Sequence, residues 1–475
     1  MRKESKILLK SLAPIIVGVV IALIPVPQGL SINAWLYFAL FAAVITGVIT
    51  EPIPSAAIGF IGVTIAAATG LVYTKPDDAI KWALSGFSNT IIWLIFAAFM
   101  FSLGYVKTGL GRRIALWLVR VLGKRTLGLG YAIATSDLAL APFTPSNTAR
   151  SGGIIYPIIV NIPAIYGSHP GETARKIGSY VLYTAFAVQC VTSSMFLTGL
   201  APNLLALSIV QKVANIQISW MTWFIGFLPA GVILFLLTPY LVYKLYPPEI
   251  KRSAEASIWA SEQLKNMGGI SRKEVSLLGL VILALALWIG GTSFIDPTTT
   301  ALLVVCLMVI LRIVNWNDVL GYKQAWNVLI WFATLVTMAD GLAKVKFIDW
   351  VANIIASSLK GLSALYVLVL MVSVFFLLHY LFASLTAHAT ALLPIFLSIA
   401  IKLPGISPTV WALALSYTLG LMGIITPYAT GPAPIYYGSG YIKSGEFWLY
   451  GLIFGIVFLV IYIVIDIPWL LSLGI

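Results

Sequence analysis

Two short polar segments, set in long apolar stretches, hold most of the side chains that could bind a ligand. They are residues 146–150 (SNTAR) and residues 384–388 (SLTAH). Hydroxyl and amide groups donate hydrogen bonds, and arginine or protonated histidine adds positive charge. Because donors dominate, the segments favour an anion, although any single hydroxyl could instead cap a helix. The candidate binding residues in them are Ser146, Asn147, Thr148, Ser384 and Thr386.

Two further segments combine threonine with glycine and proline in otherwise apolar runs. They are residues 198–203 (TGLAPN) and residues 430–440 (TGPAPIYYGSG). Proline and glycine interrupt a helix, so both segments are expected to unwind and to expose backbone groups to a cavity. Thr198 and Thr430 are the candidate binding residues here.

Arg150 and His388 are the ionisable residues of the two polar segments, and each follows its serine by four positions. A buried arginine in a membrane costs several kcal/mol unless it is paired, and such residues usually serve a function. Both are therefore candidates for compensating the charge of a bound anion. Two alternatives stay open: an ion pair of Arg150 with Asp137, and a neutral, hydrogen-bonded core histidine at position 388. Structural roles are favoured for His379, Asp340 and Asp466.

The composition places these segments in a membrane protein. Of 475 residues, 60% are hydrophobic and only 9% are charged, whereas soluble domains carry about 25% charged residues. Continuously apolar stretches such as Ile15–Ile24 indicate helices and not the alternating strands of a membrane β-barrel. Cys190 and Cys306 lie in apolar runs and offer neither a disulfide framework nor a metal site. We expect an all-α polytopic membrane protein with no metal and no cofactor.

Eleven transmembrane spans and two re-entrant hairpins are predicted from the apolar runs. The hairpins, residues 127–165 and 363–402, hold the polar segments at membrane depth, because Pro145, Gly152 and Gly153 would break a lipid-exposed helix. Residues 247–273 are expected to be a solvated cytoplasmic linker. The spans are expected near residues 7–26, 32–50, 54–73, 88–106, 176–211, 218–246, 274–292, 298–314, 326–343, 408–440 and 446–470.

Basic residues orient the chain, because lysine and arginine in short loops stay on the cytoplasmic side. With a cytoplasmic N-terminus, 21 of the 29 basic residues fall inside and seven, Lys360 among them, fall outside; Arg150 belongs to neither side. Eleven spans then place the C-terminus outside the cytoplasmic membrane. The basic stretch 107–125 is predicted to be an interfacial helix and not a nucleic-acid site, with a counterpart near 347–359 on the outer face.

The two halves of the chain repeat each other in opposite orientations. Residues 89–93 (NTIIW) match 327–331 (NVLIW), and residues 146–150 match 384–388, both at an offset of 238. The Asn/Trp spans are the fourth and the ninth, so they cross the membrane in opposite directions. Inverted repeats are a signature of secondary transporters, whose substrate site lies near the midplane at the repeat interface. The pseudo-symmetry favours a ligand with a charge at each end, such as a dicarboxylate.

At these motifs the sequence resembles the divalent anion/sodium symporter (DASS) family over essentially the whole chain. The resemblance covers both hairpin tips and both unwound segments, and it adds Gly199, Leu385 and Gly431 to the candidate binding residues. It implies a homodimer and elevator-type transport of di- or tricarboxylates of four to six carbons. Each protomer would have a scaffold domain, residues 1–126 and 274–362, and a moving transport domain, residues 127–246 and 363–475.

Two departures make the chain more similar to the exchanger branch of that family, which exchanges citrate, succinate, 2-oxoglutarate or malate. Leu385 replaces the amide of a second Ser-Asn-Thr tip, and Arg150 and His388 put cationic character where symporters would hold sodium. A fixed cation cannot leave with the substrate, so an empty site would return across the membrane only at a cost of several kcal/mol. We expect sodium-independent exchange of 2-oxoglutarate, malate, succinate and fumarate, with citrate as a further candidate.

Three alternative functions were weighed. A sodium-coupled dicarboxylate symporter of the same fold is the nearest, and an anion channel built on the same donor-rich hairpins is more remote. An intramembrane hydrolase is disfavoured because the chain has no HExxH motif and only three histidines.

Overall fold

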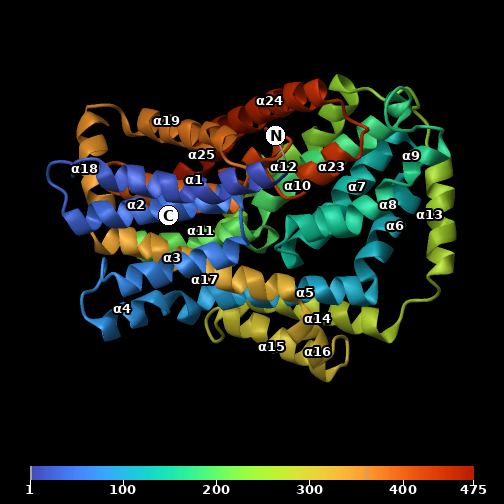
Figure 1. Cartoon of the computed structure of the whole chain (residues 1–475). Coiled ribbons are helices and arrows are strands. Elements are labelled where there is room, and N and C mark those ends of the chain that lie inside the picture. Colours follow the sequence, from blue (N-terminus) through green and yellow to red (C-terminus); the bar gives the residue numbers. More distant parts are fainter. Residues whose placement is uncertain (1–2, 360) are drawn as a thin grey trace.

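The computed structural model describes residues 3–359 and 361–475, so the predicted charges at Arg2 and Lys360 lie outside the described residues. In this part of the chain every regular element is a helix and no β-strand forms. Most long helices run along one direction, and shorter helices lie across the two ends of the bundle (Figure 1). The all-α membrane architecture expected from the composition is confirmed.

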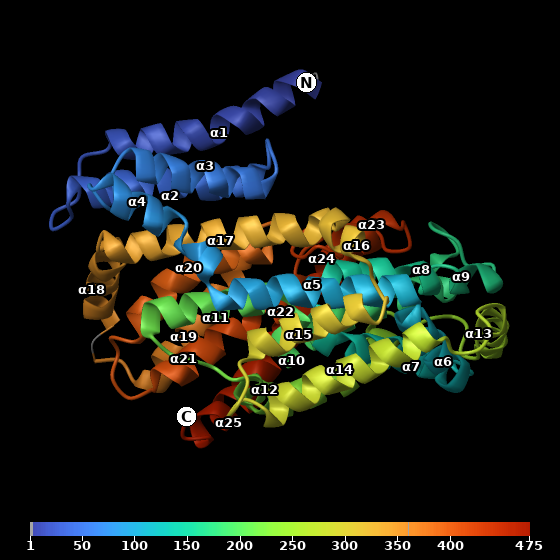
Figure 2. The ribbon, with the colours of Figure 1, turned by 90° about the horizontal axis from the view of Figure 1, so that it is seen from below.

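Continuous helices lie at the predicted positions of spans 1 to 4, 6 to 9 and 11. The first three pack together along one side of the bundle, and the second and third of them contact the ninth (Figure 2). These helices are α1 Lys3–Leu23, α2 Ile32–Thr50, α3 Ser55–Ala68, α5 Thr90–Thr108, α12 Trp220–Leu245, α14 Arg272–Gly290, α15 Pro297–Ile310, α17 Lys323–Lys344 and α24 Ser444–Ile461, with α25 Ile467–Ser472 after a π-helical turn.

Seven helices of the described chain are long and apolar enough to cross a membrane. One of them, Ala364–Leu381, belongs to the second predicted hairpin and not to a predicted span. Several predicted spans, such as the third and the eighth, are shorter apolar helices. The number of crossings therefore stays a prediction, whereas the helical positions agree with the apolar runs.

The fifth and tenth predicted spans are interrupted, as glycine and proline led us to expect. α10, Gly178–Met195, is separated from α11, Ala201–Ala214, by a break at residues 196–200. Pro202 lies in the first turn of α11, where its missing N–H would have had no helical partner. The tenth span breaks at residues 425–432 and consists of α21 Pro408–Ser416, α22 Thr418–Leu421 and α23 Ala433–Gly438.

Helix–turn–helix segments lie at the positions of both predicted hairpins, and their re-entry into the membrane stays a prediction. In the first, α7, Thr126–Leu140, leads to a less regular tip at residues 141–147 and returns through a π-helix, Thr148–Ile155. Gly152 and Gly153 were expected to break the helix, but they lie inside this π-helix. A Cβ atom at Gly152 would come within 2.5 Å of Ile435 Cδ1, so this glycine allows close packing. The remaining segments are α8 Tyr156–Ile159 and α9 Ile162–Ile165 in the first hairpin, and α19 Ala364–Leu377 and α20 Leu385–Ala400 in the second.

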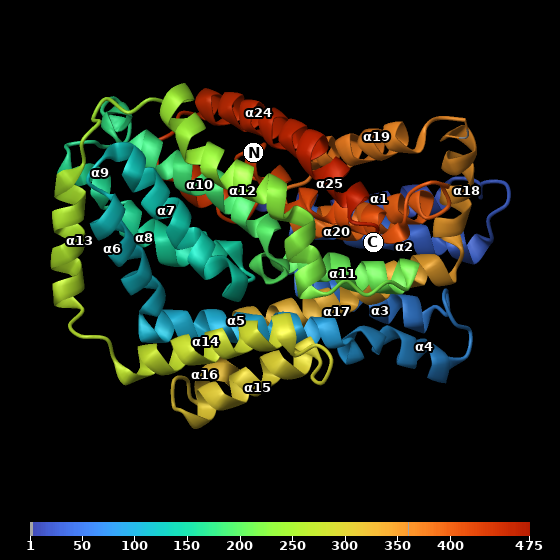
Figure 3. The same ribbon diagram turned by 180° about the vertical axis from the view of Figure 1, so that it is seen from behind.

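Residues 247–273, predicted to be a solvated linker between the two halves, include a helix that the prediction did not specify. They contain α13, Ala254–Asn266, whose Ala256 and Ala260 are fully buried. α13 packs against α6, Leu110–Leu122, the predicted interfacial helix, and this apolar contact stabilises a helix in place of free chain. These helices lie at one end of the bundle, and α18 lies at the other (Figure 3). The short helices outside the spans are α4 Pro76–Ala83, α16 Trp316–Gly321 and α18 Phe347–Leu359.

Candidate functional site

Both hairpin tips start their returning helices with the same local geometry. Ser146 Oγ accepts a hydrogen bond from the backbone N–H three positions later (3.1 Å), and Ser384 Oγ does the same (3.4 Å). The backbone N–H groups of Arg150 and His388 donate to the carbonyl oxygens of these serines at 2.9 and 3.0 Å. The correspondence at an offset of 238 residues supports the internal repeat. It also shows both serines as helix caps, the alternative role considered for such hydroxyls.

Arg150 is fully buried and has an acceptor for each of its five guanidinium N–H groups. Its Nε donates to the Asp137 carboxylate, at 3.1 Å from Oδ2 and 3.2 Å from Oδ1. Its Nη1 donates to the carbonyl oxygens of Thr144 (2.9 Å) and Gly199 (2.6 Å). The acceptors of Nη2 are the hydroxyl groups of Thr192 (3.4 Å) and Ser193 (3.0 Å).

This arrangement corrects the expectation of an unpaired cation at position 150. The Asp137 carboxylate neutralises the guanidinium and also accepts a short hydrogen bond from Thr192. A buried ion pair whose hydrogen bonds are all made is tolerated where a lone charge is not. Thr144 belongs to the first tip and Gly199 to the break of the fifth span. Arg150 therefore connects these two segments by hydrogen bonds.

His379, for which a structural role was favoured, contacts the break of the tenth span. Its Nε2 lies 2.8 Å from the Ala429 carbonyl oxygen, and since a carbonyl only accepts, Nε2 carries the proton. His388 makes no such contact: among the described residues both of its ring nitrogens are buried without a hydrogen-bond partner. Its ring packs against those of Phe375, His379 and Phe382, with centroids 4.4, 5.1 and 5.0 Å away.

The first tip meets the second break directly. Asn147 Nδ2 donates to Thr430 Oγ1 (2.8 Å) and to Gln189 Oε1 (3.1 Å). Thr148 lies so close to Gly431 that a Cβ atom on this glycine would be 1.9 Å from Thr148 Oγ1. Four predicted residues from the two halves of the chain therefore form one cluster. Gln189 was not predicted, and its only signal was an amide inside an apolar run.

The second half contacts the first through the helix that follows the second tip. Ser384, Leu385 and Thr386 begin α20, which packs along α11, the second piece of the fifth span. In the described chain, no hydrogen bond joins this tip to residues 146–150. The structure thus brings the first tip to the break of the tenth span and packs the helix after the second tip along α11, and among the described residues no hydrogen bond joins the two tips.

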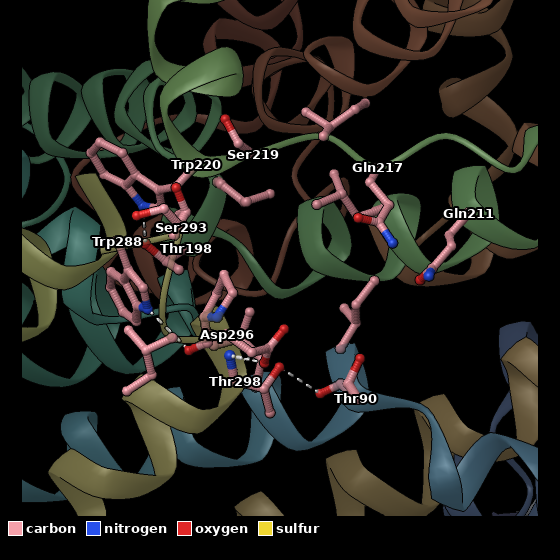
Figure 4. A pocket seen from close by; sticks show the side chains of 18 of the residues that line it. Thr90, Thr198, Gln211, Gln217, Ser219, Trp220, Trp288, Ser293, Asp296 and Thr298 are labelled. Carbon is pink, nitrogen blue, oxygen red and sulfur yellow. Dashed lines mark hydrogen bonds between the residues drawn. The ribbon is translucent and has the colours of Figure 1, made fainter. Parts of the chain in front are cut away.

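A cavity of about 550 Å³ reaches the break of the fifth span at Thr198 (Figure 4). Thr198 Oγ1 donates to the Pro142 carbonyl (2.5 Å) and accepts from Trp220 Nε1 (3.2 Å). The other walls come from the start of α5, the end of α11 and the loop before α15, which sets the cavity between the predicted scaffold and transport domains. Its further polar lining residues include Thr90, Gln211, Gln217, Ser219, Ser293 and Asp296.

Replacing Gly431 by alanine is expected to lower the melting temperature of the purified protein, because the new methyl group would overlap Thr148 Oγ1. Overpacking of this kind costs about 1–3 kcal/mol. Thermal unfolding in detergent measures the change, and the double variant Gly431→Ala/Thr148→Ala should recover part of it. Gly438→Ala is the control, since nothing lies within 4 Å of a Cβ atom there. Equal melting of Gly431→Ala and wild type would contradict the close contact.

Comparison with known proteins identifies the family. Residues 5–475 match the family described as the sodium:sulfate symporter transmembrane region. The chain belongs to this family. It is therefore a multi-pass membrane transporter and not an enzyme.

Two relatives agree with the exchanger branch of the family. The citrate/succinate antiporter of Escherichia coli (strain K12) is 48% identical over 458 residues, covering 94% of this chain and 94% of that protein. The L-tartrate/succinate antiporter of Shigella sonnei (strain Ss046) is 48% identical over 456 residues, covering 93% and 94%. The resemblance to the DASS family and its exchangers is confirmed.

Two solved structures share the fold. The YdaH transporter of Alcanivorax borkumensis gives a TM-score of 0.57 at 17% identity and covers 88% of this chain and 98% of that one. MtrF of Neisseria gonorrhoeae gives 0.56 at 15% identity and covers 87% and 94%. At these identities the likeness concerns the fold alone.

Proposed function

We propose that this transporter exchanges dicarboxylates of four to six carbons across the cytoplasmic membrane without sodium. The candidate substrates are 2-oxoglutarate, malate, succinate and fumarate, with citrate as a further one. Relatives named as citrate/succinate and L-tartrate/succinate antiporters are similar to the chain over more than nine-tenths of its length, which supports this substrate class and the antiport reaction.

The proposal that transport is independent of sodium rests on the position of the Arg150 guanidinium group. In transporters with broken helices, backbone carbonyl groups freed at the break coordinate the coupling ion. Here Arg150 Nη1 donates to the carbonyl oxygen of Gly199, and in the second half His379 Nε2 donates to that of Ala429. These two carbonyl oxygens, which a sodium ion would need as ligands, thus already accept hydrogen bonds from nitrogen donors.

The Asp137–Arg150 ion pair removes the argument that an unpaired arginine makes exchange obligatory. The Asp137–Arg150 pair is neutral as a whole, so an unpaired arginine does not hinder the return of the empty site in this arrangement. Obligate exchange is proposed from the antiporter relatives alone. Charge compensation during transport is assigned to His388 when protonated; since both of its ring nitrogens are buried without a hydrogen-bond partner here, this role requires a rearrangement that exposes the ring to the substrate.

We propose that the substrate lies between the hairpin tips and the breaks. Thr148 is half-buried and Gly431 is exposed, so the cluster has an open edge at this point. Asn147 and Thr430 bond to each other here and would turn their donors to a carboxylate. The proposed binding residues are Ser146, Asn147, Thr148, Thr198, Gly199, Ser384, Leu385, Thr386, Thr430 and Gly431.

Transport by an elevator motion in a homodimer, with the N-terminus in the cytoplasm, completes the proposal. The hairpins and broken spans of the two halves contact one another, as in the pair Ser151 Oγ and Tyr436 Oη at 2.8 Å, so they can move as one body. The scaffold would consist of residues 1–126 and 274–362.

Counterflow in proteoliposomes tests this function. Liposomes loaded with succinate should take up labelled succinate equally fast in potassium and in sodium buffer, and liposomes without internal dicarboxylate should take up none. Competition by 2-oxoglutarate, malate, fumarate, citrate and sulfate ranks the substrates. Sodium-driven uptake into empty liposomes would establish a symporter instead, and unitary currents in a planar bilayer would establish a channel.

A further inference from the structure

A second cavity, of about 450 Å³, lies away from the hairpin tips and is lined by charged side chains. Three lysines reach it from three segments: Lys81 from α4, Lys212 from α11 and Lys344 at the end of α17. We call these three residues and the space between them the lysine vestibule. Its other lining residues are Tyr73, Asp78, Trp82, Ser85 and Asp340.

The vestibule has an excess of positive charge. Among the described residues none of the three lysines lies within ion-pair distance of a carboxylate. Asp340 already accepts a hydrogen bond from Trp82 Nε1 at 3.1 Å. Asp78 lies in the first turn of α4, where the helix dipole stabilises a carboxylate. Three ammonium groups against two carboxylates leave a net positive charge of one, which favours an anion.

The vestibule is separate from the proposed transport site. Lys212 lies eleven residues after Ala201, the first residue of α11, which corresponds to roughly 16 Å along the helix axis. The neighbouring residue, Gln211, lines the cavity that reaches Thr198. α11 therefore has the vestibule at its far end and the cavity that reaches Thr198 beside it.

We propose that the lysine vestibule is a second anion site, which captures dicarboxylates on the outer side before they enter the transport site. The proposal rests on the proposed function for the identity of the anion. All three lysines lie in segments that the predicted topology puts outside. Lys81 and Lys344 belong to the proposed scaffold and Lys212 to the transport domain, so the site lies where the two domains meet.

Protection of the lysines from an amine-acylating reagent tests binding without any transport. In the purified full chain, succinate should reduce the labelling of Lys81, Lys212 and Lys344, read by mass spectrometry, relative to acetate at the same ionic strength. Lys75, exposed at the start of α4 and outside the cavity lining, is the internal control and should label equally in both anions. Equal labelling of the three lysines in succinate and acetate would overturn the site.

Transport kinetics give a second, independent measurement. With substrate supplied from outside, the variant Lys81→Gln/Lys344→Gln should raise KM about 5-fold, leave the maximal rate unchanged and lose most of the dependence of kcat/KM on salt. Lys75→Gln should behave as wild type. An unchanged KM and salt dependence in the double variant would also overturn the site. If wild type exchanges no dicarboxylate while succinate still protects the lysines, the proposed function fails and the vestibule stands.

Discussion

Replacing Arg150 by alanine is expected to abolish dicarboxylate exchange and to destabilise the fold by about 3–5 kcal/mol, the usual cost of stranding one partner of a buried ion pair. The change leaves the Asp137 carboxylate in the protein interior without its cation. It also removes the donors of the Thr144 and Gly199 carbonyl oxygens, which hold the tip against the break. Melting temperature and counterflow measure the two effects.

Two further variants separate stability from transport at this position. Lysine has three donors on one nitrogen against the five of arginine, so Arg150→Lys should remain folded in part but should not exchange. The neutral pair Asp137→Asn/Arg150→Gln should recover most of the melting temperature, because no charge is left buried, and should still fail to exchange. Normal exchange by this pair would remove Arg150 from the mechanism.

An exposed ion pair offers the matched control. Lys107 Nζ lies 2.8 Å from Asp318 Oδ1 at the end predicted to be cytoplasmic, and Lys107 is 45% exposed. Because water screens such a pair, Lys107→Ala should change neither melting temperature nor exchange measurably. If Arg150→Ala melted like Lys107→Ala, the buried pair would not have the structural role assigned to it.

Replacing Asn147 by aspartate is expected to lower exchange at least about 100-fold while the protein stays folded. The amide donates to Thr430 and Gln189 in the middle of the proposed site, and a carboxylate of the same shape cannot donate. Hydrogen bonds to charged groups contribute about 1.5–3 kcal/mol, and the added negative charge also repels the substrate. Counterflow at saturating and at limiting succinate measures the loss.

Asn161→Asp is the matched control in the same hairpin. Asn161 Nδ2 donates to the Pro157 carbonyl (2.7 Å) in a solvent-exposed turn, so the same change of charge there should leave exchange near the wild-type rate. Wild-type exchange by Asn147→Asp would contradict the placement of the substrate at the first tip. Equal losses in both variants would point to a general effect of charge and not to the site.

Much of the fold could be predicted from the sequence because the membrane imposes local constraints. Long apolar runs had to form helices, and glycine and proline in TGLAPN and its counterpart had to interrupt them. The hairpins followed from polar residues inside apolar blocks. The same reasoning did not anticipate two local details, the π-helix that holds Gly152 and the helix within residues 247–273. A glycine that permits contact with Ile435, and a helix such as α13 that is stabilised by packing on α6, depend on neighbours distant in the chain.

The candidate site likewise has features that the sequence determines and features that only the tertiary structure decides. The sequence by itself determined which polar residues interrupt the apolar runs, since their segments and their repeat at an offset of 238 can be seen without a structure. Only the tertiary structure decided their partners. Asp137 neutralises Arg150, and Asn147 donates a hydrogen bond to Thr430. The carbonyl oxygen at the second break accepts a hydrogen bond from His379 and not from His388. The physical reason is that the two effects act over different distances along the chain. The cost of an unsatisfied group in lipid is local, whereas the partner that satisfies it is chosen by the packing of elements far apart in the chain, 283 residues in the case of Asn147 and Thr430.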